Sequence, residues 1–243
     1  MTPTDLKIKI FADGANLGDM LRLYADPHIR GFTTNPTLMR KAGIDDYRSF
    51  ALEVVRAIAD RPISFEVFAD DFDRMFCQAL EFSGWGPNVF VKIPVTNTRR
   101  QSSAELVRRL TRRGVQVNVT AVMTLPQVHE MTAALRGGAP AYLSIFAGRI
   151  ADAGRDPLPL VAEALRTMRA APNVEMIWAS PREVLNVVQA DRVGCHVITM
   201  TNDLLKKLDL LGKDLEEFSL ETVRMFYDDA QAAGYGARRL AAA

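Results

Sequence analysis

Short runs of β-branched and aromatic residues alternate along this chain with longer segments in which apolar residues recur at helical spacing. We expect strands at residues 8–13, 31–35, 63–68, 89–95, 115–123, 141–148, 174–180 and 196–202. Amphipathic segments typical of helices cover residues 44–60, 71–82, 102–114, 124–136, 158–170, 181–193 and 214–233. The pattern thus predicts an α/β protein in which eight strands alternate with helices.

Strict alternation of strands and helices is typical of a parallel sheet, because each parallel pair needs a crossover connection. Eight such units in 243 residues favour a closed (β/α)8 TIM barrel. The main alternative is an open doubly wound sheet, but no G-x-G-x-x-G motif follows the first strand. No linker or compositional break divides the chain. We therefore predict one barrel domain over residues 1–243, with 214–243 as an additional C-terminal helix and tail.

Composition narrows the class of partner. The net charge of +1 provides no global attraction for nucleic acid or for an anionic membrane. The N-terminus does not resemble a signal peptide, and no apolar run approaches the roughly 20 residues that span a bilayer. The cysteines Cys77 and Cys195 form no disulfide framework, and the histidines His28, His129 and His196 lack metal-ligand spacing. We expect a cytoplasmic protein with no metal, no cofactor, no nucleic-acid partner and no membrane partner.

One strand carries an unexpected charge. In "NVFVKIPVTN", residues 88–97, Lys92 stands in the middle of an apolar run that is typical of a buried strand. A lysine at such a place can simply extend its amine to solvent. However, only seven of the 30 basic residues are lysines, so arginine is the ordinary surface cation of this chain. Lysine is the cation that can lose its proton and act as an amine nucleophile, which makes Lys92 a catalytic candidate.

Other polar residues fall near the carboxyl ends of the expected strands, where barrel enzymes place their functional groups. They are Asp13, Thr34, Asn35, Glu66, Asn118, Thr120, Ser144 and Ser180. Each alone also suits a turn, a helix cap or an ordinary strand position. A closed barrel would gather them around Lys92. A lysine facing a carboxylate, hydroxyls and amides has the groups needed for Schiff-base chemistry on a polyhydroxylated carbonyl compound.

The motifs "FADGAN", "TTNPTL", "SFEV", "VKIPVT", "VNVT", "SIFAGR" and "ASPRE" occur in this order across residues 11–183. Together they resemble the transaldolase family, in the short-chain form that also includes the fructose-6-phosphate aldolases. The resemblance implies a barrel of the class I aldolase type, with Lys92 as the Schiff-base lysine. It implies that Glu66 and Thr120 handle water and protons, and that Asp13 accepts the proton of the hydroxyl whose carbon–carbon bond breaks. It also implies that Asn35, Asn118 and Ser144 hold the dihydroxyacetone hydroxyls.

A phosphate site is expected after the seventh strand. "SPRE" matches a capping box, with Ser180 as N-cap, Pro181 at the first helical position and Glu183 three residues after the cap. This pattern also fits a well-capped helix with no further role. A cation in the first turn, Arg182, opposes the helix dipole unless an anion is present. The resemblance implies that Ser180, Arg182 and Arg149 bind the sugar phosphate. For Arg99 and Arg100 a solvated basic turn is favoured over an anion contact.

Two functions follow from the resemblance, and one alternative is not catalytic. A transaldolase would pass a dihydroxyacetone unit from a ketose phosphate to an aldose phosphate, whereas a fructose-6-phosphate aldolase would release it. The aldolase branch typically carries glutamine where this chain has Glu66 and tyrosine where it has Phe146, so both positions favour transfer. A sugar-phosphate-binding protein without turnover is the alternative. The resemblance also implies a homo-oligomer. It leaves open the stoichiometry, the donor and acceptor sugars, and whether the pathway is primary or specialised.

Overall fold

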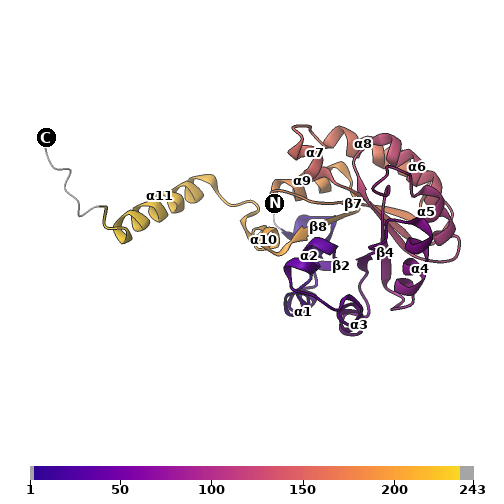
Figure 1. The fold of residues 1–243 in the computed structure, drawn as a ribbon. Helices are drawn as coiled ribbons and strands as arrows, with labels where there is room; N and C mark the ends of the chain where they lie inside the picture. The colour runs from indigo at the N-terminus through magenta and orange to yellow at the C-terminus, as the bar shows by residue number, and fades with distance from the viewer. Residues whose placement is uncertain (1–2, 236–243) are drawn as a thin grey trace. The chain divides into compact units, whose positions relative to one another are not determined.

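The computed structural model describes residues 3–235, and residues 6–206 form the barrel unit. Its eight parallel strands close in sequence order, because β8 pairs with β1. Figure 1 shows helices surrounding these strands. The strands are β1 Lys9–Asp13, β2 Ile29–Thr33, β3 Ile63–Glu66, β4 Val89–Pro94, β5 Val117–Val122, β6 Ala141–Ile145, β7 Val174–Trp178 and β8 Val197–Thr201. The predicted (β/α)8 TIM barrel is confirmed.

The helices of the barrel unit follow the expected amphipathic segments, with shorter elements added at the strand ends. They are α1 Leu17–Tyr24, α2 Pro36–Lys41, α3 Tyr47–Ala57, α4 Phe72–Ser83, α5 Ala104–Thr111, α6 Leu125–Leu135, α7 Ala147–Asp152, α8 Leu158–Met168, α9 Leu185–Val193 and α10 Asn202–Leu205. The hydrophobic pattern did not single out α1, α2, α7 or α10. Each of these has eight residues or fewer, and so short a segment shows little more than two turns of helical periodicity.

The core has two parts because side chains alternate across each strand. Val91 and Ile93 of β4 point outward and are fully buried beneath the helices. Phe90 and Lys92 alternate with them and face the barrel interior, where Phe90 joins a buried cluster with Phe11 and Tyr142. This aromatic cluster fills the barrel, and polar side chains occupy the interior positions two residues further along the same strands.

Most strands end one to three residues earlier than the apolar pattern predicted, and two of these differences move residues of the predicted site. β2 covers Ile29–Thr33 instead of 31–35, because Asn35 caps α2 and Pro36 occupies its first turn. β6 ends at Ile145 instead of 148, because α7 begins at Ala147. Thr34, Asn35 and Phe146 therefore belong to the loops at the carboxyl-terminal mouth of the barrel.

A second compact unit contains the short 3₁₀ turns Pro3–Asp5 and Leu208–Leu210 and the helix α11 Leu215–Ala232. The expected C-terminal helix is thus present, and Asp214 caps it by accepting hydrogen bonds from the amides of Glu216 and Glu217. Residues 236–243 of the expected tail lie outside the described residues. Among residues 3–235, no helix combines the length and the apolar character that crossing a membrane requires.

Candidate active site

Lys92 lies in the barrel interior on β4, and only 6% of its surface is exposed. Its Nζ donates a hydrogen bond of 3.0 Å to the carbonyl oxygen of Thr34. It also lies 3.7 Å from Oε2 of Glu66, which is opposite Lys92 in the β3–β4 register. A buried lysine is stabilised by such a carboxylate and carbonyl, so the amine is held in one place rather than extended to solvent.

Two carboxylates share the interior with this amine. Burial raises the pKa of Asp13, while the charge of Lys92 and a hydrogen bond from Thr33 act in the opposite direction. Burial also raises the pKa of Glu66; Lys92 again lowers it, and the negative charge of Asp13 raises it further. Because burial dominates in both cases, the two side chains retain a proton at higher pH than ordinary carboxylates do. Carboxyl groups with raised pKa values are suited to proton transfer near neutral pH.

Asp13 is held in place by a threonine pair that the sequence pattern did not single out. The Thr33 hydroxyl donates to Oδ1 of Asp13 at 2.7 Å and lies 2.5 Å from the hydroxyl oxygen of Thr199. Asp13 pairs with Thr33 in the β1–β2 register and with Thr201 in the β1–β8 register. Alternation along β2 places Thr33 and not Thr34 on the interior face. This alternation was the sequence signal that could have identified Thr33.

A second polar chain crosses β3, β5 and β6. Ser144 donates to Oδ1 of Asn118 at 2.7 Å, and Asn118 donates to the hydroxyl of Ser64 at 3.0 Å. All three side chains are buried. Asn118 and Ser144 come together as predicted, and Ser64 is an additional member that shares a strand face with Glu66.

Thr120 is buried, and its hydroxyl makes no hydrogen bond among the described residues. Thr120 lies in a β-bulge, where the four residues of β5 from Val119 to Val122 match the three residues of β6 from Leu143 to Ile145. Ala121 adopts a left-handed φ of 62° at this bulge. The bulge lets Thr120 face the interior while Val122 stays fully buried. A buried polar atom without a partner destabilises the fold, and such atoms are often kept because they serve a function. Thr120 is therefore a candidate for contact with a reacting group.

Thr34 and Asn35 contribute differently from the prediction. The Thr34 hydroxyl donates to the carbonyl of Ser64, so Thr34 offers Lys92 its carbonyl oxygen and not its hydroxyl. The Asn35 side chain accepts a hydrogen bond of 3.0 Å from the amide of Leu38 and caps α2. Its amide nitrogen makes no hydrogen bond among residues 3–235, so it has donor capacity left for a ligand.

Tyr47 of α3 was not anticipated as a neighbour of the site. Its hydroxyl accepts a hydrogen bond from the backbone amide of Glu66 at 3.0 Å and donates to the carbonyl of the same residue at 3.1 Å. Burial raises the pKa of Tyr47, so the phenol stays neutral and can make both bonds. These two bonds hold the end of β3, and with it the Glu66 backbone, in place.

The predicted capping box at Ser180 is wrong. Helix α9 begins at Leu185, and the amides of Arg182 and Glu183 instead donate to Oδ1 of Asn186. Ser180 has a φ of 61°, in the left-handed region, whereas an N-cap residue normally has extended backbone geometry. The residues from 180 to 184 therefore form a loop that turns toward α7.

This loop lies against the start of α7 at Gly148. A Cβ atom added to Gly148 would lie 1.5 Å from the carbonyl oxygen of Ser180 and 3.4 Å from Nε of Arg182. The amide of Gly148 donates to the carbonyl of Ala179 at 3.4 Å. Only glycine permits this close approach of two backbones, which brings the Ser180 loop next to the helix that carries Arg149.

Arg182 is held by a bidentate ion pair with Asp152 of α7, in which Nε donates to Oδ1 at 2.9 Å and Nη2 donates to Oδ2. Arg182 lowers the pKa of Asp152, mainly through this hydrogen bonding, and the charge of Arg149 contributes in the same direction. The structure thus brings Arg149 and Arg182 to one acidic group. A carboxylate with two arginines nearby occupies a place that also suits a phosphate.

The remaining candidates lie at the edges of the site. Phe146 is half-buried and packs against the cluster of Phe11, Phe90 and Tyr142 inside the barrel. Arg99 and Arg100 lie in an exposed turn organised by Asn97, whose side-chain oxygen accepts from the amide of Arg99. Within residues 3–235, no group of three or more His, Cys, Asp or Glu side chains is arranged to hold a metal ion.

Comparisons with known proteins agree with the motifs. The family model described as "Transaldolase/Fructose-6-phosphate aldolase" matches residues 10–237. A "Probable transaldolase" of Dehalococcoides mccartyi is 32% identical over 83% of this chain and 90% of its own length. Another, from Methanococcus maripaludis, is 34% identical over 87% of this chain and 95% of its own. The fold alone is also similar to a solved "putative lyase/mutase" of Burkholderia cenocepacia J2315, with a TM-score of 0.58 and 14% identity over 84% of this chain and 79% of that one.

The family match covers nearly the whole barrel, and it includes every strand that contributes to the interior polar groups. The relatives align over almost their full lengths, so the likeness is not confined to one motif. The predicted family is confirmed: this chain belongs to the transaldolase/fructose-6-phosphate aldolase family.

Proposed function

We propose that this protein is a transaldolase that transfers a dihydroxyacetone unit from a ketose phosphate, fructose 6-phosphate or sedoheptulose 7-phosphate, to an aldose phosphate through a Schiff base on Lys92. The observation that carries the proposal is the buried amine of Lys92, held between the carbonyl of Thr34 and the carboxylate of Glu66. An amine nucleophile next to a proton-transferring carboxylate is the arrangement that imine formation requires.

In the first half of the reaction the Lys92 amine attacks the C2 carbonyl of the ketose phosphate. The carbinolamine loses water and becomes an imine, with Glu66 supplying the proton to the departing hydroxyl and Thr120 orienting the water. Asp13 then takes the proton of the C4 hydroxyl while the C3–C4 bond breaks. The bond electrons move into the imine to give an enamine on Lys92, and an aldose phosphate leaves.

In the second half the enamine carbon attacks the aldehyde carbon of the acceptor, and the new alkoxide takes the proton back from Asp13. Water then hydrolyses the imine and frees the Lys92 amine. Asn35, Asn118 and Ser144 would hold the hydroxyls of the three-carbon unit, supported by the Ser64–Asn118–Ser144 chain of hydrogen bonds. The raised pKa of Glu66 supports its role, because the group has to deliver a proton near neutral pH.

Arg149, Arg182 and Ser180 would bind the substrate phosphate. The proximity of both arginines to Asp152 supports this role, since a carboxylate already accepts the bidentate pair from Arg182. A phosphate would have to replace the Asp152 carboxylate as the partner of Arg182. Arginine suits this exchange, because its planar donors bind carboxylate and phosphate with similar geometry.

The test is a paired assay on the purified protein. Fructose 6-phosphate is supplied with and without erythrose 4-phosphate, and the products are identified by mass spectrometry. We expect sedoheptulose 7-phosphate and glyceraldehyde 3-phosphate with the acceptor, and little free dihydroxyacetone without it. Free dihydroxyacetone at equal rates in both reactions would assign the chain to the aldolase branch. Binding of the ketose phosphate with no product in either reaction would indicate a binding protein.

Phe146 supports transfer over release, because the enamine must wait for an aldehyde. An apolar ring beside the intermediate excludes water and offers no proton donor. We expect Phe146→Tyr, which adds a hydroxyl able to position water, to raise the ratio of dihydroxyacetone released to dihydroxyacetone transferred in the paired assay. Phe76→Tyr is the matched control, because Phe76 lies on the outer helix α4 beneath Arg109 and Arg113. An unchanged ratio in Phe146→Tyr would show that Phe146 does not control whether dihydroxyacetone is released or transferred.

The Thr33–Asp13 bond yields a prediction for pH dependence. Asp13 has to be ionised to accept a proton, and the Thr33 hydroxyl lowers its pKa. Thr33→Val removes that donor, so the pKa of Asp13 should rise and the acidic limb of kcat/KM should move to higher pH, with a smaller loss on the alkaline side. Thr132→Val is the control, because its buried hydroxyl on α6 has no partner among the described residues. Equal loss at every pH would argue against Asp13 as the titrating group.

We also infer that copies of the chain associate, which stays a prediction. The helix α11 exposes a large fraction of Leu215, Val223, Met225, Phe226 and Tyr227. An exposed apolar face of this kind is typical of an interaction surface. The exposed face supports the homo-oligomer expected from the family resemblance.

A further inference from the structure

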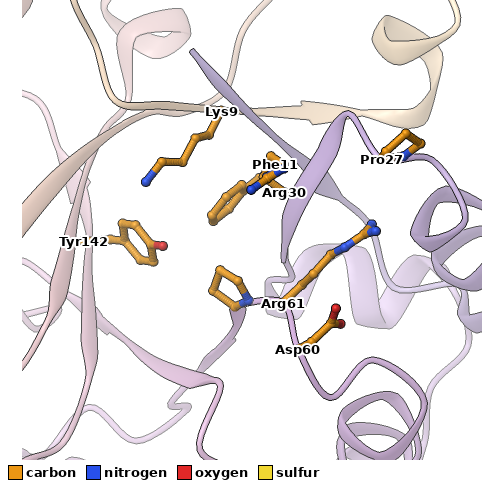
Figure 2. A pocket seen from close by; sticks show the side chains of 8 residues that line it. Lys9, Phe11, Pro27, Arg30, Asp60, Arg61 and Tyr142 are labelled. Atoms are coloured by element: carbon orange, nitrogen blue, oxygen red, sulfur yellow. The ribbon is translucent and has the colours of Figure 1, made fainter. Parts of the chain in front are cut away.

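A cavity of about 400 Å³ opens at the amino-terminal mouth of the barrel, the end opposite to Lys92. Its lining includes Lys9 and Phe11 of β1, Arg30 of β2, Arg61 just before β3, and Tyr142 of β6. Figure 2 shows these side chains around one space. Asp13 and Ser144 lie further along β1 and β6, so the proposed active site begins on the far side of the aromatic cluster. The volume is within the range of small-molecule sites.

Some of the charged side chains at this mouth have a partner and others do not. Lys9 pairs with Glu175 at 2.6 Å. Arg61 donates to the carbonyl of Asp26 at 3.2 Å, and its guanidinium lies 4.5 Å from the centre of the Tyr24 ring.

The acidic residue of the lining is Asp60, which accepts a hydrogen bond of 2.7 Å from the Tyr24 hydroxyl. The Arg30 side chain, in contrast, has no ion pair or hydrogen bond with any of residues 3–235. With Glu175 included, this mouth carries three cations, Lys9, Arg30 and Arg61, against two carboxylates, and the Arg30 cation has all its donors free.

The Tyr142 hydroxyl is the second feature that suggests a ligand. Only 7% of this residue is exposed, and its ring is packed at 4.5 Å against Phe90 and at 5.6 Å against Phe11. Its hydroxyl makes no hydrogen bond within the described part of the chain, and Figure 2 shows it pointing toward the space that the labelled residues enclose. Burial raises the pKa of Tyr142, so the hydroxyl stays a donor at neutral pH. The ring is buried while the hydroxyl opens into the cavity, so a ligand there can accept a hydrogen bond from it.

We propose that the amino-terminal mouth of the barrel is a binding site for a small organic anion, a carboxylate or a phosphate monoester, distinct from the proposed catalytic site. The anionic group would contact Arg30 and Lys9 and accept a hydrogen bond from Tyr142. The apolar part of the ligand would lie against the Phe11 ring. Lys9 and Arg30 are both exposed at the opening, so a ligand can reach them from solvent. The proposal does not depend on the function proposed for the other mouth.

The experiment is isothermal titration calorimetry of the full chain with benzoate, phenyl phosphate and the uncharged benzyl alcohol. We expect benzoate or phenyl phosphate to bind with a dissociation constant below the millimolar range, and benzyl alcohol to bind at least about tenfold more weakly. The anion with the lower dissociation constant shows whether the site prefers a carboxylate or a phosphate monoester. Arg30→Gln and Tyr142→Phe should each weaken that binding about five- to tenfold, because each removes donors to the anion. Tyr142→Phe keeps the ring and its packing.

Two controls separate this site from the catalytic end. Arg56→Gln removes an exposed arginine on the outer helix α3 and should leave binding unchanged. Arg182→Ala removes the proposed phosphate contact at the opposite mouth, so it should leave benzoate binding unchanged and remove at most a second, separate binding event of phenyl phosphate. Binding lost in Arg182→Ala but kept in Arg30→Gln would place the anion at the catalytic end and overturn the proposal. Absence of binding heat with both benzoate and phenyl phosphate at millimolar concentration would overturn it as well.

Discussion

Replacing Lys92 with arginine should lower kcat by about 10⁴-fold or more, which is the scale of loss when a covalent nucleophile is removed. Arginine keeps the positive charge that faces Glu66 and Asp13, but it does not form an imine at ordinary pH. The expected loss of kcat therefore reports the loss of the amine nucleophile and not the loss of a positive charge. Turnover is measured in the paired transfer assay, and circular dichroism with a thermal melt verifies that the variant is folded.

Borohydride trapping supplies the direct readout for the same residue. Reduction in the presence of fructose 6-phosphate should fix a dihydroxyacetone-derived adduct on Lys92, located by peptide mapping. Lys41→Arg is the matched control, because Lys41 is an exposed lysine at the end of α2, and this variant should be labelled and active like the original protein. An adduct on another lysine, together with normal turnover of Lys92→Arg, would refute the mechanism.

Gly148→Ala should destabilise the protein and selectively impair the use of phosphorylated substrates. Helix propensity alone favours alanine by about 1 kcal/mol. The added Cβ would lie 1.5 Å from the carbonyl oxygen of Ser180, and no side-chain rotation relieves a clash between Cβ and backbone. Overpacking of this kind costs roughly 1–3 kcal/mol or more, so the clash exceeds the gain in propensity. For a chain of 243 residues each kcal/mol lowers the unfolding midpoint by about 2–4 °C, so a net cost of about 2 kcal/mol should lower it by about 4–8 °C.

The same clash separates α7 from the loop that carries Ser180 and Arg182. The value of kcat/KM for fructose 6-phosphate should therefore fall more than that for unphosphorylated fructose. Gly18→Ala is the control, because a Cβ at this position of α1 meets only the Asn16 side chain at an ordinary 3.4 Å. A variant as stable as the original, or an equal loss for both substrates, would contradict the assignment of this contact to phosphate binding.

The interior polar groups show how much of the site can be predicted from the alternation of side chains along a strand. The period of two residues was sufficient to place Lys92, Glu66, Asn118 and Ser144 inside the barrel, and the structure brings them together. Thr33 and Ser64 were missed, although they obey the same alternation. They acquire a role only because register places Thr33 opposite Asp13 and brings Ser64 within reach of Asn118. Register between strands far apart in sequence is not encoded in any one segment.

The error at Ser180 has a different cause. "SPRE" satisfies the local pattern of a helix start, but the backbone at Ser180 is left-handed and Asn186 takes the free amides of Arg182 and Glu183. Contact with Gly148, thirty-two residues earlier in the chain, accompanies that conformation. A capping pattern describes only local hydrogen bonds, so a contact between two distant backbones can replace it.

By itself the sequence determined the barrel, the family and the strand that carries the candidate nucleophile, because hydrophobic periodicity and motif order are properties of short segments. Only the tertiary structure decided which polar side chains meet. It paired Thr33 with Asp13, brought Arg182 to Asp152, and placed the Tyr142 hydroxyl, which has no partner among residues 3–235, in a cavity that Arg30 also lines. These outcomes depend on strand register, closure of the barrel and the approach of loops that are distant along the chain, so they exist only once the whole chain is folded.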